Sequence, residues 1–139
     1  MYARTPSLRY RTICRLLTVR REIDYSLARR SVIRDYRGGS LSHDDVCDAH
    51  PELIRAAACL GRLTDEACPV CGDVGLKLVS YVYGTSPKTG EGRAVSTAAE
   101  LRKFSRAFDK LDCYDVEVCL GCKWNFRVRS YVVGRRSTG

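Results

Sequence analysis

The sequence predicts an α+β protein, in which an N-terminal helical segment precedes an antiparallel β unit that carries an inserted helix. In the first half, apolar residues recur at intervals of three and four, the period of a helix that is buried on one face. In the second half, runs rich in Val and Tyr alternate with polar residues, which favours strands. The composition, 45% hydrophobic and 29% charged, is that of a folded globular chain.

Three helices are expected in the first half, over residues 24–37, 42–49 and 51–60. Gly38 ends the first helix, and Ser42 with Asp45 has the form of a capping box that opens the second. Pro51 suits the first turn of the third helix, which ends at Gly61. The first helix is expected to bury Tyr25, Leu27, Ala28, Val32, Ile33 and Tyr36, and to expose Arg29, Arg30, Arg34 and Arg37.

Strands and one more helix are expected in the second half. Residues 76–83 form a strand that ends at the loop 84–92. Thr97 and Glu100 have the spacing of a second capping box, which opens the inserted helix to about Leu111. Residues 114–133 then predict two strands joined at a turn.

The net charge of +8 is unevenly distributed. Residues 1–37 hold ten arginines and three acidic residues, residues 38–67 two arginines and six acids, and residues 68–139 twelve basic residues and seven acids. Positive charge at both ends favours contact with a polyanion such as RNA or DNA, or with an acidic protein surface. A solvated surface that only prevents aggregation is the alternative.

These shifts in charge and periodicity divide the chain into three segments. Residues 1–21 are a basic arm without an apolar period, and nothing in their sequence requires them to be ordered. Residues 22–63 form a helical module, and residues 64–139 form the β domain.

Four cysteines in the β domain have the spacing of a metal site. They form two Cys-x-x-Cys pairs, Cys68 with Cys71 and Cys119 with Cys122, separated by 47 residues. Each turn can place two thiolates on one ion, and two turns supply the tetrahedron that zinc prefers. Gly72 and Gly121 suit the tight turns in which backbone N–H groups approach sulfur. We therefore expect one structural Zn²⁺ per chain in a zinc-ribbon-like domain.

Two other uses of these cysteines are weaker interpretations. A dithiol redox motif needs one pair and leaves the other unexplained. A zinc deaminase carries H-x-E followed by P-C-x-x-C, and His50-Pro51-Glu52 does precede Cys68. However, Ala67 rather than proline precedes Cys68, and the second pair would have no role. The remaining cysteines, Cys14, Cys47, Cys59 and Cys113, are expected to act as small hydrophobic residues.

No set of catalytic residues is apparent. A four-thiolate site has no open position for an activated water, and neither a nucleophile motif nor a phosphate loop occurs. We therefore expect no enzymatic activity and no small-molecule substrate. The N-terminus lacks the apolar core of a signal peptide and no run approaches the ~20 apolar residues of a membrane span, so a cytoplasmic location away from membranes is expected.

The segment after the second cysteine pair predicts a binding face. From residue 123 to 132 the side chains alternate, which places Trp124 and Phe126 in the core and Lys123, Arg127, Arg129 and Tyr131 outward. Such a row of donors suits phosphates, although a plain polar strand face has the same pattern. The candidate binding residues are Lys103, Arg106, Lys123, Arg127, Arg129, Arg29 and Arg30.

Four segments carry a resemblance to a known family: residues 24–30 (DYSLARR), 45–53 (DVCDAHPEL), 68–71 (CPVC) and 117–125 (EVCLGCKWN). Over about residues 22–134 the chain resembles a family of small actinobacterial proteins without an established activity. The cysteine turns also resemble zinc ribbons, which are common in transcription and ribosome-associated factors. This likeness and the charge favour a non-catalytic factor that binds nucleic acid or a machine such as RNA polymerase or the ribosome. The alternative is a protein-interaction adaptor without nucleic-acid contact.

Overall fold

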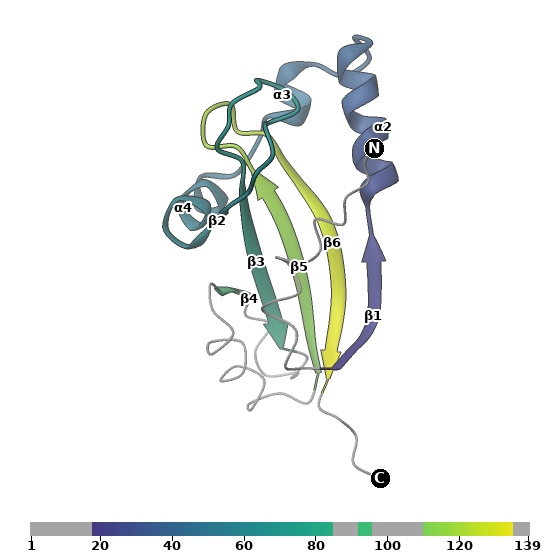
Figure 1. The fold of residues 1–139 in the computed structure, drawn as a ribbon, viewed down its shortest axis with the longest axis vertical. Coiled ribbons are helices and arrows are strands. Elements are labelled where there is room, and N and C mark those ends of the chain that lie inside the picture. Colours follow the sequence, from purple (N-terminus) through teal and green to yellow (C-terminus); the bar gives the residue numbers. More distant parts are fainter. Residues whose placement is uncertain (1–17, 85–91, 96–109, 135–139) are drawn as a thin grey trace.

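The fold is α+β, as predicted, with helices that precede and flank an antiparallel sheet (Figure 1). A computed structural model of the 139-residue chain describes residues 18–84, 92–95 and 110–134. Its helices are α2 (Ser26–Arg37), α3 (His43–Val46) and α4 (Pro51–Leu60). Its strands are β1 (Thr18–Asp24), β2 (Arg62–Leu63), β3 (Lys77–Gly84), β4 (Gly92–Val95), β5 (Lys110–Val118) and β6 (Asn125–Gly134).

The sheet within these residues has six strands in the order β1-β6-β5-β3-β2, and β4 also pairs with β3. Every pairing is antiparallel. β5 and β6 are the two strands expected over residues 114–133, and β3 is the strand expected over residues 76–83. The expected helix over residues 97–111 falls mostly outside the described residues, but its last two residues, Lys110 and Leu111, belong to β5.

Strand β1 is a feature that the sequence did not predict. Thr18–Asp24 pairs along β6, from Thr18 opposite Gly134 to Asp24 opposite Arg129. The expected boundary between the basic arm and the helical module, at residues 21 and 22, therefore lies inside a strand. Helix α2 begins at Ser26, not Asp24, because Asp24 still pairs in the sheet and its carboxylate accepts the Ser26 backbone N–H at 2.7 Å.

The short helices begin as predicted, but α3 ends at Val46 and not at about Ala49, because the Ala49 N–H bonds to the Lys123 carbonyl instead of continuing the helix. In α3, the Ser42 hydroxyl accepts from the Asp45 N–H at 3.2 Å while the Asp45 carboxylate accepts from the Ser42 N–H at 2.8 Å. This is the predicted capping box. In α4, Pro51 lies in the first turn, and His50 caps the helix by accepting from the Glu52 N–H at 3.1 Å.

The buried face of α2 differs from the predicted one. Ile33 is buried and Val32 and Tyr36 pack against it, as expected. Leu27, however, is 74% exposed and Ala28 is also exposed, whereas Arg29 is half-buried in their place. The helical period alone fits both arrangements, and the connection from β1 fixes the rotation of the helix about its axis.

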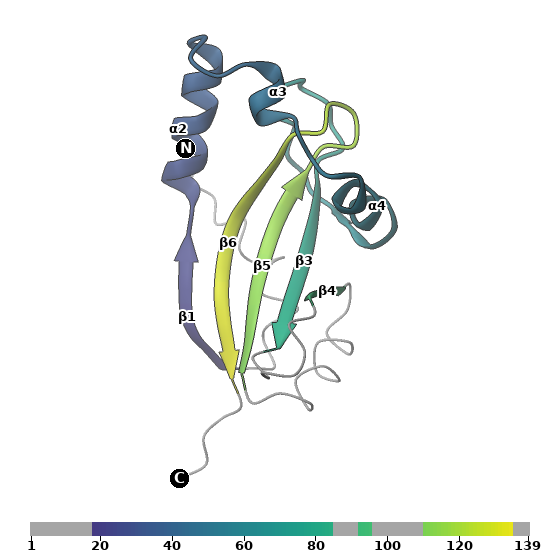
Figure 2. The same cartoon turned by 180° about the vertical axis from the view of Figure 1, so that it is seen from behind.

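Two apolar clusters hold the helices on the sheet. One joins α2 and α3 to the two cysteine turns and contains Ile33, Val46, Cys47, Cys68, Leu76, Cys119 and Trp124. The other packs α4 on one face of the sheet and contains Ala49, Ala57, Val79 and Val118. Figures 1 and 2 show α3 beside both cysteine turns at one end of the sheet, with α4 along its β3 side. None of the helices in the described ranges is long and apolar enough to cross a membrane.

The packing of α4 gives a first test. Ala57 is fully buried against the sheet whereas its neighbour Ala58 is exposed. Ala57→Leu should overpack this contact and lower the free energy of unfolding by about 1–3 kcal/mol, as measured by denaturant unfolding. The matched control, Ala58→Leu, should leave stability nearly unchanged. Equal effects of the two substitutions would contradict the observed orientation of α4.

Candidate metal centre

The two cysteine turns have the same backbone geometry. Cys68 donates its N–H to the Asp73 carbonyl at 2.8 Å, and its own carbonyl accepts from the Gly72 N–H at 2.9 Å. Cys119 makes the same two bonds: its N–H donates to the Trp124 carbonyl at 2.8 Å, and its carbonyl accepts from the Lys123 N–H at 3.0 Å. Because each turn is closed in this way, each pair of thiols is held on the same side of its loop.

In each turn, the residue four positions after the first cysteine has a positive φ, in the left-handed region. In the first turn this residue is Gly72, with φ of 77°, as the sequence predicted. In the second it is Lys123, with φ of 72°, and not Gly121. A Cβ on Gly121 would lie 3.1 Å from an Asp73 carboxylate oxygen, a tight contact that the Asp73 side chain would have to relieve.

The four thiols converge as the spacing predicted. All four sulfurs of Cys68, Cys71, Cys119 and Cys122 lie within 4.8 Å of one another. Between the turns, the Sγ atoms of Cys68 and Cys122 and those of Cys71 and Cys119 are each 3.6 Å apart. A tetrahedral ion with bonds of about 2.3 Å to sulfur requires sulfur separations of about 3.8 Å. The cluster therefore has the size to hold one metal ion.

The surroundings of the cluster combine burial with local hydrogen bonds. Cys68 and Cys119 are buried and Cys71 is exposed. Burial raises the pKa of Cys68 and of Cys122 to about 12 each, whereas a hydrogen bond from the Asp73 backbone lowers the pKa of Cys71. A bound cation would replace the protons that burial retains on Cys68 and Cys122.

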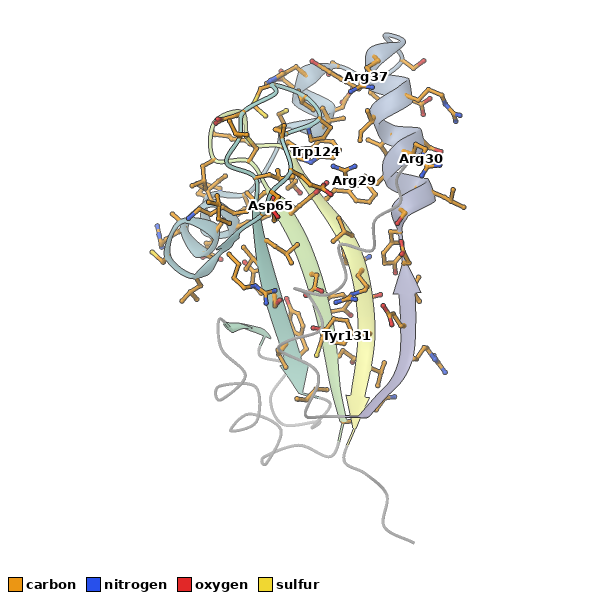
Figure 3. All side chains as sticks on the ribbon, viewed as in Figure 1. Arg29, Arg30, Arg37, Asp65, Trp124 and Tyr131 are labelled. Atoms are coloured by element: carbon orange, nitrogen blue, oxygen red, sulfur yellow. The ribbon has the colours of Figure 1, made fainter. Side chains whose placement is uncertain are left out.

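Trp124 lies behind the second turn, as its position in the alternation predicted. It is 1% exposed, stacks on Phe126 with ring centres 6.0 Å apart, and donates its indole N–H to Glu117 at 3.1 Å. Glu117 also accepts from Arg29, which reaches from α2 toward Trp124 (Figure 3). Burial raises the pKa of Glu117, and Arg29 opposes that shift. This group joins α2 to the sheet beside the metal centre.

Comparison with known proteins identifies relatives of this chain. Residues 16–139 match a family of unknown function, DUF5318. The chain belongs to this family. It is 40% identical over 112 residues to the uncharacterized proteins Rv0049 of Mycobacterium tuberculosis and Mb0050 of Mycobacterium bovis, a match that covers 81% of each chain. No solved structure matches it. The DUF5318 assignment agrees with the resemblance read from the sequence and adds no activity.

Like Arg29, the predicted binding residue Arg129 forms an ion pair with a buried carboxylate. Arg129 donates to Asp115 at 2.9 Å and to Glu22 at 3.1 Å, and so joins β6 to β5 and β1. Asp115 is 1% exposed and also accepts from Ser80 at 2.8 Å. Burial raises the pKa of Asp115, and the charge of Arg129 opposes the shift. Tyr131, expected to face outward, is also buried (Figure 3).

A bulge in β6 explains why Arg127 and Arg129 separate. Val116 lies opposite Arg127 and Asp115 opposite Arg129, so Val128 is an extra residue in β6. Adjacent residues of β5 point to opposite faces, and residues directly opposite each other share a face. Arg127 and Arg129 therefore lie on opposite faces, and the expected single row of Lys123, Arg127 and Arg129 is wrong.

Arg127 lies on the same face of the sheet as Val116 and Val118, the face on which α4 packs. It is exposed, and its guanidinium lies 5.4 Å from the centre of the Tyr25 ring and 5.0 Å from that of Tyr114. Tyr83, 36% exposed, packs edge-on against Tyr114 at 5.5 Å. Among the other candidates, Lys123 and Arg30 are exposed, and Lys103 and Arg106 lie outside the described residues.

Several residues of the site were not predicted. Glu117 and Asp115 are buried, although they lie in a strand of alternating polar and apolar residues, where acidic side chains usually face water. Cys47, expected to be an ordinary hydrophobic residue, lies with its sulfur 3.6 Å from that of Cys122. Its position directly before Asp48-Ala49-His50 gives no local signal of this contact.

The left-handed position of the first turn is directly testable. Gly72→Ala should lower the free energy of unfolding by about 1–2 kcal/mol, because a Cβ is strained at this φ. Gly75→Ala is the control, since a Cβ at Gly75 meets no atom within 4 Å. Denaturant unfolding of both variants makes the comparison. A loss at Gly75 as large as that at Gly72 would show that the turn geometry described here is incorrect.

Proposed function

We propose that this chain is a non-catalytic, zinc-ribbon-like factor that holds one structural Zn²⁺ and binds nucleic acid or a nucleic-acid machine, such as RNA polymerase or the ribosome. The donor set supports zinc, since four thiolates are soft ligands and form closed tetrahedral sites. A closed site has no position for substrate or activated water, which supports a structural role.

The size of the zinc contribution supports this role. Structural zinc contributes about 10–16 kcal/mol of apparent binding free energy, which equals or exceeds the ~5–15 kcal/mol that stabilises a typical domain. Cys68, Cys119 and Trp124 belong to the apolar cluster that joins α2 and α3 to the sheet. Loss of zinc would therefore loosen this end of the fold.

The observation that carries the binding proposal is the position of Arg127. Its exposed guanidinium lies between Tyr25 and Tyr114, with Tyr83 beside them. A cation among partly exposed aromatic rings offers both a phosphate contact and surfaces on which bases stack. Arg30, Arg34, Arg37 and Lys123 are further exposed cations of the described residues that could add phosphate contacts.

Arg29 and Arg129, two of the predicted binding residues, have a different role in this proposal. Each pairs with a buried carboxylate, Arg29 with Glu117 and Arg129 with Asp115. Breaking a buried ion pair costs about 3–5 kcal/mol, more than a surface phosphate contact returns. We therefore assign them to positioning α2 and the strands and not to contact with a partner.

The adaptor alternative also has a specific observation in its favour. Leu63 is 62% exposed and Val74 is 81% exposed, near the acidic stretch between residues 44 and 66. An apolar and acidic surface would suit a protein partner better than a polyanion. In that case the arginines would only be solvated.

Metal content is the first test of the proposal. Purified protein should contain about one zinc per chain by elemental analysis. Removing it with a chelator should shift Trp124 fluorescence to the red, because this side chain is 1% exposed in the folded protein and water would reach it. Well-folded protein without metal, or a red-shifted spectrum before chelation, would contradict the zinc centre.

Salt-dependent binding tests the nucleic-acid proposal. For single-stranded RNA or DNA, log K should fall with log[salt], and Arg127→Ala should flatten that slope by about 0.7, the loss of one phosphate contact. Arg55→Ala, an exposed arginine on α4, is the control and should change the slope less. Both variants should fold, since both side chains are exposed.

The two candidate functions give opposite outcomes in this experiment. Absence of salt-sensitive binding by the full chain, together with recovery of a protein partner from nuclease-treated lysate, would replace the nucleic-acid proposal with the adaptor. An unchanged slope in Arg127→Ala would reject the tyrosine-flanked arginine as the contact.

A further inference from the structure

We propose that Cys47 is a fifth thiol of the metal centre, which donates a hydrogen bond to Cys122 and thereby tightens zinc binding. The inference rests on the proposed zinc centre. It assigns Cys47 a positioning role and not that of a fifth ligand. The four sulfurs that lie within 4.8 Å of one another belong to the two Cys-x-x-Cys pairs, and Cys47 meets this set at Cys122.

The geometry at Cys47 matches that within the cluster. Its sulfur donates to that of Cys122 over 3.6 Å, the same separation as the contacts between the two turns. Cys47 is 8% exposed and lies in the apolar cluster with Cys68 and Cys119. Water therefore has little access to this side of Cys122, and Cys47 supplies the donor that water would otherwise provide.

The backbone holds Cys47 in this position. Its N–H donates to the His43 carbonyl at 2.8 Å at the end of α3. Two further bonds tie the following residues to the second turn: the Ala49 N–H donates to the Lys123 carbonyl at 3.1 Å, and the Asn125 amide donates to Asp48 at 3.0 Å. The segment 47–49 is thus attached directly to the turn that carries Cys122.

A donor at this place has a clear physical effect. Four thiolates around a divalent ion carry excess negative charge, and a hydrogen bond to one sulfur delocalises part of it. It also fixes the rotamer of Cys122 before the ion binds. Partners of this kind typically change metal affinity by about 10–100-fold when they are removed.

The test compares substitutions at Cys47 that differ in one donor group. Cys47→Ala removes the donor, Cys47→Ser replaces it with a hydroxyl, and Cys47→Val removes it with little change in volume. Zinc affinity of the full chain is measured by competition with a chromophoric chelator. The control is Cys59→Ser, at an exposed thiol on α4, which should bind zinc like the parent.

The expected result is a loss of zinc affinity of about 10–100-fold for Cys47→Ala and Cys47→Val, and a smaller loss for Cys47→Ser. If the two variants without a donor fail to fold with zinc while Cys47→Ser folds, the donor is required and the proposal stands. Parent-like affinity in Cys47→Ala and Cys47→Val would overturn it. An equal loss, or a failure to fold, in all three would also overturn it, because packing would then explain the effect. A parent chain without zinc would instead reject the proposed zinc centre itself.

Discussion

The structure depends on bringing two cysteine turns, far apart in the chain, against each other. The first turn ends just before β3 and the second begins just after β5, and the sheet pairs Lys77 with Val118 at those ends. The β3–β5 register thus places Cys68 and Cys71 beside Cys119 and Cys122. A shift of one strand by one residue would turn the side chains of that strand to the other face and separate the thiols. The β3–β5 register therefore brings the four cysteines together, and a metal ion bound to them would in turn hold the two strands in this register.

Part of the positive charge of this basic chain is taken up by ion pairs inside the molecule. Arg29 and Arg129 each neutralise a buried carboxylate, and both ion pairs join segments that are distant in sequence. Replacing such pairs with apolar residues often leaves stability unchanged, so their value lies in allowing one arrangement of α2 and of the strands. A count of arginines overstates the positive surface available to a partner.

What remains on the surface defines the functional proposal. The bulge at Val128 turns Arg129 inward and leaves Arg127 on the opposite face, flanked by Tyr25 and Tyr114. The candidate metal centre lies at one end of the same sheet, in the apolar cluster that also holds α2, which carries Tyr25 at its N-cap. If the proposed zinc is bound there, its loss would loosen α2 and so disturb the surface around Arg127 as well.

The sequence by itself determined the features that depend on neighbouring residues. The helix ends at Gly38 and Gly61, the Ser42–Asp45 capping box and the two Cys-x-x-Cys pairs of the candidate metal centre follow from signals within a few positions. Only the tertiary structure decided which face each arginine takes, that β1 joins β6, and that Cys47 reaches Cys122. These contacts join residues 75 positions apart for Cys47 and Cys122, and 107 apart for Glu22 and Arg129. No local pattern encodes them, because one unpaired residue in β6 is enough to reverse the alternation on which a prediction from the sequence depends.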